Sequence, residues 1–235
     1  MNLIDLVILV ILGASVAYSL YRGFLHTLLS VGCCVLSVLL AFSFAPRLSA
    51  IVSGSEGITA EMATYTDAIT RVQDYDLANM PVDQLNDELI ARVLAKTSLP
   101  APIATILESN LRGRVFASAG LIRVNDYVSN TVVAVTINVL CFLAAFVVIY
   151  LILSVLVSLI QHVFQFPLLK QLDWLAAGVF GLSRGALLVY VVFLLLPILS
   201  TVIRLEAFDE LLAQSTFASI FQSNGFFASV IVGRL

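Results

Sequence analysis

The sequence predicts an all-α, polytopic membrane protein with about four transmembrane helices and a small helical extramembrane segment. Hydrophobic residues make up 60% of the 235 residues and charged residues only 11%, against about 45–50% and about 25% in soluble chains. The charges are unevenly placed, because residues 6–21, 23–46, 127–169 and 185–203 contain none. Since lipid offers the backbone no hydrogen-bond partners, apolar segments of this length are expected to form helices.

The composition also argues against other classes of protein. A soluble enzyme of this length would need more charge to cover its surface, and a net charge of -3 offers no basic surface for nucleic acid. The chain contains no G-x-S-x-G, H-E-x-x-H or Walker A motif. We therefore expect no enzymatic activity, no catalytic residues, no cofactor and no nucleic-acid partner, with the lipid bilayer as the first partner.

Residues 1–46 are predicted to form a transmembrane hairpin, with helices at about 3–20 and 25–45. The opening residues 1–5 include Asp5 and no basic side chain, whereas a cleaved signal peptide begins with a positive region. The first helix is therefore predicted to be retained. Gly13 and Ala17 give it a weak small-xxx-small step of the kind that lets membrane helices approach closely.

Residues 47–130 are predicted to form an extramembrane helical insertion. The segment 47–126 holds seventeen charged residues, and Glu88 with Arg92 forms an i,i+4 pair in the favourable order. Apolar residues recur there at helical spacing in two places. The first set is Leu85, Leu89 and Val93, and the second is Ile103, Ile106, Leu107 and Leu111. Two to four short helices are expected, and Pro100 and Pro102 are predicted to end one of them.

Residues 131–204 are predicted to form a second transmembrane hairpin, with helices at about 132–160 and 178–203. Residues 205–235 are predicted to form an amphipathic C-terminal tail, in which Leu205, Phe208, Leu211 and Leu212 share one face. Such a helix can lie along the membrane surface or dock onto the protein itself.

No metal or disulfide site is expected. The two histidines, His26 and His162, have no second ligand at i+3 or i+4. The three cysteines lie in apolar spans without CxxC spacing, which predicts buried free thiols.

Charged residues close to the membrane are the stronger candidates for function, because ionisable groups in a bilayer are costly. Asp5 opens the first span, Arg22 closes it before Gly23, Asp173 precedes the last span and Arg184 lies within it. In one straight helix over 174–203, Arg184 would lie about 15 Å from the start. That depth requires a partner, a water-filled cavity or a shallower start. Asp173 shares its helical face but lies too far away to touch it, and Asp5 is another candidate partner.

Small residues surround Arg184. Ala177, Gly181 and Gly185 form two successive small-xxx-small steps, and Gly178 adds a further small residue. Such residues let helix backbones approach closely in lipid, so helix packing is the favoured interpretation of this cluster. The arrangement of an acid followed by Arg-Gly occurs in both halves of the chain, which suggests two related helical hairpins.

Residues 172–185 (LDWLAAGVFGLSRG) resemble the Asp…Gly-Ala-x-x-Gly-x-x-Arg-Gly segment of the CvpA, or colicin V production, family. Here Ala177-Gly178 stands where Gly-Ala is commoner. Residues 2–8 and 21–24 resemble the first helix and the Arg-Gly-Phe turn of that family. The resemblance covers roughly residues 1–50 and 130–205 and leaves out the middle segment.

The resemblance implies a bacterial integral membrane protein of about four helices that is required for toxin production or export. It gives importance, without a mechanism, to Asp5, Arg22, Gly23, Asp173, Gly181, Arg184 and Gly185. Two functions stay open. One is a non-enzymatic accessory or scaffold in toxin production, export or envelope maintenance, which acts through a membrane-protein partner or a second copy. The other is a small oligomeric transporter or channel with Arg184 and Asp173 or Asp5 near a polar path.

The expected location is the bacterial plasma membrane, crossed several times. Arg22 and Lys170 lie on the short connections, with Arg184 nearby, so the positive-inside rule places these connections in the cytoplasm. Both termini and residues 47–126 are then predicted to be extracytoplasmic.

Overall fold

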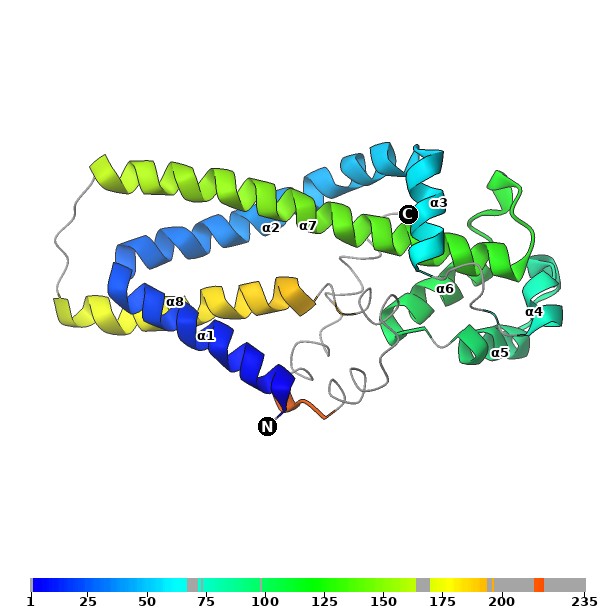
Figure 1. The fold of residues 1–235 in the computed structure, drawn as a ribbon, viewed down its shortest axis with the longest axis horizontal. Helices are drawn as coiled ribbons and strands as arrows, with labels where there is room; N and C mark the ends of the chain where they lie inside the picture. The colour runs from blue at the N-terminus through cyan, green and yellow to red at the C-terminus, as the bar shows by residue number, and fades with distance from the viewer. Residues whose placement is uncertain are drawn as a thin grey trace. The chain divides into compact units, whose positions relative to one another are not determined.

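Four long apolar helices dominate the structure, a computed structural model (Figure 1). The residues it describes are 2–66, 72, 74–97, 99–163, 170–193, 196 and 214–217. The long helices are α1 (Leu3–Arg22), α2 (Phe24–Ser53), α7 (Val124–Val163) and α8 (Lys170–Phe193). Each has an apolar stretch long enough to cross a bilayer. The predicted all-helical membrane fold is thereby confirmed.

The ends of these helices differ from the predicted ends of the apolar spans. Helix α2 continues to Ser53 through Pro46, and α7 already begins at Val124. Hydropathy marks the stretch that lipid can surround, whereas backbone hydrogen bonding continues through polar residues. The predicted tail over 205–235 lies outside the described residues except for 214–217.

The chain divides into two compact units. The first, here called the four-helix unit, comprises residues 1–46, 141–195 and 206–224. The second, here called the small-helix unit, comprises residues 47–140, 196–205 and 225–235. Helices α2 and α7 each contribute one part to each unit.

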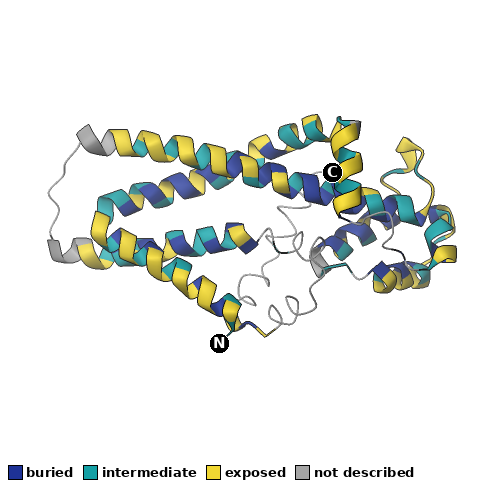
Figure 2. Cartoon of the chain, in the orientation of Figure 1, coloured by how far each residue is buried: buried dark blue, intermediate teal, exposed yellow. Residues whose placement is uncertain are grey.

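The four-helix unit exposes apolar residues along its helices, and Figure 2 colours all exposed positions yellow. Apolar residues that are at least half exposed include Leu3, Leu6, Val7 and Val10 of α1 and Val147, Val148, Leu151, Ile152 and Val155 of α7. Contiguous apolar surface of this extent is unusual on a protein surrounded by water. It is the surface expected of helices whose solvent is lipid.

Local interactions fix both ends of α1. Asn2 and Asp5 form a capping box, in which the Asn2 side chain accepts from Ile4 N at 3.3 Å and Asp5 accepts from Asn2 N at 3.2 Å. At the other end Gly23 has a positive φ of 87° and donates to Ser19 O at 2.9 Å. Helix α2 begins at the very next residue, so this sharp turn favours glycine.

The small-helix unit builds its own hydrophobic core. It contains α3 (Glu56–Tyr65), α4 (Tyr75–Asn79), α5 (Asp87–Thr97), α6 (Ala101–Gly113), the short turns η1 (Val82–Gln84) and η2 (Ala117–Ala119), and the start of α7. The buried core residues are Val72, Leu77, Val82, Ile90, Val93, Leu107, Leu111, Val124, Tyr127 and Val128. Helices α5 and α6 lie where apolar spacing predicted helices, except that Leu85 of the first set precedes α5 and ends η1.

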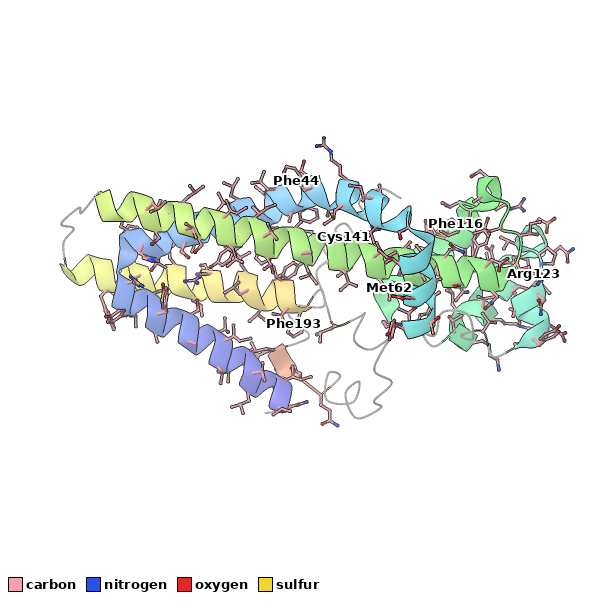
Figure 3. The ribbon with its side chains drawn as sticks, turned by 45° about the horizontal axis from the view of Figure 1, so that its top comes forward. Phe44, Met62, Phe116, Arg123, Cys141 and Phe193 are labelled. Atoms are coloured by element: carbon pink, nitrogen blue, oxygen red, sulfur yellow. The ribbon has the colours of Figure 1, made fainter. Side chains whose placement is uncertain are left out.

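Polar contacts supplement this core. The buried Asn110 amide donates to Thr131 Oγ1 at 3.0 Å, and the predicted pair Glu88–Arg92 is formed at 2.8 Å on the surface of α5. The Phe116 ring, labelled in Figure 3, packs edge-on against Tyr127 with centroids 5.2 Å apart. Residues 47–130 thus contain a folded helical unit and are not a featureless linker.

Candidate functional site

Helices α1 and α8 pack against each other at the glycines of α8. A Cβ on Gly181 would lie 2.6 Å from Cβ and Oγ of Ser19, and one on Gly185 would lie 3.1 Å from Cβ of Ser15. At Gly178 the nearest atom, Cδ2 of Leu20, is 3.6 Å away. The hydroxyl of Ser15 also donates to Gly181 O at 2.8 Å. The two backbones can therefore approach this closely only because α8 carries glycine here.

The step predicted at Gly13 and Ala17 is not part of this contact. A Cβ on Gly13 would meet no atom within 4 Å among the described residues, and both positions are exposed. Helix α1 presents Leu12, Ser15, Val16 and Ser19 to α8 instead. The prediction names the wrong pair on α1, because Ser15 and Ser19, which are also small and four residues apart, face the glycines of α8 instead.

The contact brings Arg184 of α8 to the aromatic ring of Tyr18 on α1. The guanidinium carbon lies 5.2 Å from the ring centroid, and one guanidinium nitrogen donates to Tyr150 of α7 at 3.0 Å. Arg184 Nε is buried and has no hydrogen-bond partner among the described residues. Leaving such a donor unpaired costs about 1–3 kcal/mol. Arg22 reaches the same ring, at 5.6 Å.

These residues line a cavity of about 130 Å³ in the four-helix unit. Its lining consists of Tyr18, Arg22, His26, Ser30, Cys33, Tyr150, Ser154, Val157, Ser158 and Arg184. All four long helices contribute, and most of the lining is polar although it lies within apolar helices. The cavity is thus a candidate binding site.

The hydroxyl groups of this cavity were not among the site residues predicted from the sequence. Tyr150, Ser154 and Ser158 recur every four residues in α7, and His26 and Ser30 have the same spacing in α2. Residues four apart share a helical face, so a search for polar positions at this spacing would have found them. Single serines and tyrosines in apolar spans carry no charge, so they stand out less in the sequence than the ionised residues do.

Asp5 is not the partner of Arg184. It lies thirteen residues from Tyr18 on α1, which is about 20 Å along the helix axis. Its side chain is only 2% exposed and accepts from the Ser215 hydroxyl at 2.6 Å and from Phe217 N at 3.2 Å. Asp5 therefore connects the start of α1 to the segment 214–217 through two hydrogen bonds. The side chain of Asp173 lies outside the described residues, although its backbone belongs to α8.

In the described part of the chain, the histidine, cysteine and acidic side chains do not gather into one cluster. No group of three or more His, Cys, Asp or Glu side chains converges there, and the three cysteines are free and buried. His26 and Cys33 both line the cavity, but seven residues of helix separate them by about 10 Å along the axis. That is beyond the reach of direct proton transfer. The side chain of His162 lies outside the described residues.

The fold and the cavity define a class: a polytopic helical membrane protein with two arginines at a polar, partly open cavity that all four long helices line. The family model of the colicin V production protein matches residues 4–72 and 109–225. The chain therefore belongs to the colicin V production protein family. No curated protein and no solved structure matches it.

The matched ranges include Asp5, Arg22, Gly23 and the glycine-arginine segment of α8. The resemblance predicted from the motifs is confirmed, and the match extends beyond the predicted ranges into the middle of the chain. Residues 73–108 stay outside it. They form α4, η1, α5 and the first part of α6.

Proposed function

We propose that this protein is a non-enzymatic accessory or scaffold of the bacterial plasma membrane that serves toxin production, export or envelope maintenance. The family supports this proposal through its description. The observation that carries it is the small-helix unit. Residues 73–108 lie outside the family match, yet Ile90 and Val93 of this segment share a closed core with Tyr127 of α7.

A segment with its own core offers a rigid surface to a partner. The exposed face of α5 is charged, with the Arg92 and Glu88 side chains 63% and 72% exposed. Charged, exposed side chains suit recognition by a polar partner surface and contribute little to stability. The partner is a membrane protein or a second copy of this chain.

The scaffold is tested in a toxin-producing strain that lacks its own copy of the protein. Adding back the full chain should restore toxin in the medium, and a photo-crosslinker at position 88 or 92 should give one reproducible protein adduct. A crosslinker at Leu151, which is 58% exposed on α7, should mark lipid instead. Normal toxin export without the chain, together with no adduct at positions 88 and 92, would refute the scaffold.

The proposed orientation has both termini and residues 47–126 outside the cytoplasm. Short connections that carry Arg22 and Lys170 support it. Because Cys33, Cys34 and Cys141 are buried, a cysteine introduced at exposed position 88 should be the one that reacts. An impermeant maleimide added to intact spheroplasts should label it, and labelling only after lysis would reverse the orientation.

A small oligomeric transporter or channel is the second candidate, and the cavity beside Arg184 favours it. A polar space within apolar helices is where a membrane protein places a solute path. In proteoliposomes, Arg184→Lys should keep part of the flux of small anions and Arg184→Ala should lose it. If the parent protein and both variants give no flux above empty vesicles, this candidate fails.

A further inference from the structure

The cavity in the four-helix unit carries an excess of positive charge. The guanidinium carbons of Arg22 and Arg184 lie 5.6 and 5.2 Å from the centroid of the same Tyr18 ring. The two carbons are therefore less than about 11 Å apart, and although Arg22 is exposed and Arg184 partly buried, like charges at this separation repel each other. The described lining of the cavity contains no carboxylate.

The protein offsets this charge only in part. Among the described residues, neither arginine forms an ion pair. Arg184 has the Tyr150 hydroxyl and the face of Tyr18, while its buried Nε has no hydrogen-bond partner there. A guanidinium carries five N–H donors, so most of the donor capacity of Arg184 is not used by the described part of the chain.

The neutral groups of the lining suit an oxyanion as well. Tyr150, Ser154 and Ser158 follow one another every four residues along α7 and line the same cavity. Hydroxyl groups can donate to an anion that the arginines attract. A volume of about 130 Å³ is enough for several water molecules or for a small oxyanion in their place.

We propose that this cavity binds a phosphate-class oxyanion, supplied either by a lipid headgroup or by free inorganic phosphate. Arg184 and Arg22 donate charge-assisted hydrogen bonds to it, and the hydroxyls of α7 complete the site. A phosphate offers three or more acceptor oxygens to donors on different helices, whereas a carboxylate offers two in one plane. The proposal stands on this geometry and holds for a scaffold as well as for a transporter.

The first arm of the test measures free phosphate. The full chain is placed in nanodiscs of phosphatidylcholine, and inorganic phosphate is titrated by calorimetry. The second arm measures lipid: the protein is exchanged into nanodiscs containing phosphatidylglycerol, and lipid that stays bound after extraction is counted by native mass spectrometry. Binding in the first arm identifies free phosphate as the source, and retained phosphatidylglycerol identifies the lipid headgroup.

The same variants are used in both arms. Arg184→Gln and Arg22→Gln should each weaken binding at least tenfold, because each removes charge-assisted hydrogen bonds, and Arg184→Lys should weaken it less. Arg47→Gln is the matched control, since Arg47 is an exposed arginine of α2 that does not line the cavity. It should bind as the parent does.

A serine double variant keeps the test decisive if an arginine variant does not fold. Ser154 and Ser158 are exposed on α7, so Ser154→Ala with Ser158→Ala should keep the fold and the charge while weakening binding about threefold through lost hydroxyl donors. Helical content by circular dichroism is measured for every variant. No binding by the parent in either arm overturns the proposal. So does unchanged binding by the folded Arg184→Gln variant or, if that variant does not fold, by the serine double variant.

Discussion

Gly181 of α8 lies against Ser19 of α1 so closely that a Cβ on the glycine would come within 2.6 Å of the serine Cβ. The Cα of Val16 would be only 3.2 Å away. Neither atom is the far end of a flexible side chain, so Gly181→Ala should force the helices apart. We expect the free energy of unfolding to fall by about 1–3 kcal/mol, the usual cost of overpacking, measured by denaturant titration in mixed micelles.

The other glycines provide a graded control for this prediction. Gly185→Ala should cost less than Gly181→Ala, because its nearest contacts are at 3.1 Å and include the flexible end of Leu12. At Gly178 a Cβ would be in ordinary contact at 3.6 Å, and at Gly32 of α2 it would meet no described atom within 4 Å. Alanine at either position should change the free energy of unfolding by less than about 1 kcal/mol, since helix propensity then dominates. Equal losses at all four positions would show that α1 and α8 are not packed as described.

The buried carboxylate of Asp5 should be coupled energetically to Ser215. The Ser215 hydroxyl donates to Asp5 at 2.6 Å in a buried environment. Ser215→Ala should lower the thermal unfolding midpoint of the parent, and the effect should be at least halved in an Asp5→Ala background, because the bond is then already lost. Additive effects of the two substitutions would mean that the contact contributes nothing.

Removing one partner of the buried Asn110–Thr131 hydrogen bond should cost more stability than removing both. Thr131→Val removes the acceptor of the Asn110 amide and leaves a buried donor unpaired, at a cost of about 1–3 kcal/mol. Adding Asn110→Leu should recover part of this loss, because no polar group then stays unpaired. Chemical denaturation of the full chain measures both variants. A double variant that is less stable than Thr131→Val would contradict this interpretation.

Surface ion pairs should contribute much less than core packing to the stability of the small-helix unit. Hydrogen bonds from Arg112 to Glu108 and Asp87 raise the pKa of Arg112 above its usual value. A raised pKa means stability that is present at neutral pH and lost only as the pH rises through that pKa.

Because these groups are solvated, Arg112→Ala should shift the unfolding midpoint only slightly, and less so in high salt. Leu107→Ala, at a fully buried position, should cost about 2–5 kcal/mol. The two variants are compared by thermal unfolding at low and high salt. A larger drop in the unfolding midpoint for Arg112→Ala than for Leu107→Ala would contradict this prediction.

The sequence predicted the four apolar helices and the short helices α5 and α6, because hydropathy and helical spacing are properties of one segment at a time. It did not predict which helices meet. The neighbour of Gly181 is Ser19, more than 150 residues earlier, and no local pattern identifies that pairing. For the same reason Asp5 is wrongly predicted as a partner of Arg184, whose described contacts are Tyr18 and Tyr150. The cavity that Arg184 lines is in line with the predicted alternative of a water-filled cavity.

Magic-angle-spinning NMR in lipid bilayers tests most directly the claim that Arg184 is held at a polar cavity within the four-helix unit. With arginine and tyrosine labelled by ¹³C, two guanidinium carbons should show cross-peaks to one tyrosine ring, matching the separations of 5.2 and 5.6 Å. Tyr18→Phe should remove both cross-peaks, and Arg184→Lys should remove one. A spectrum of the folded protein in which no arginine correlates with Tyr18 would contradict the account.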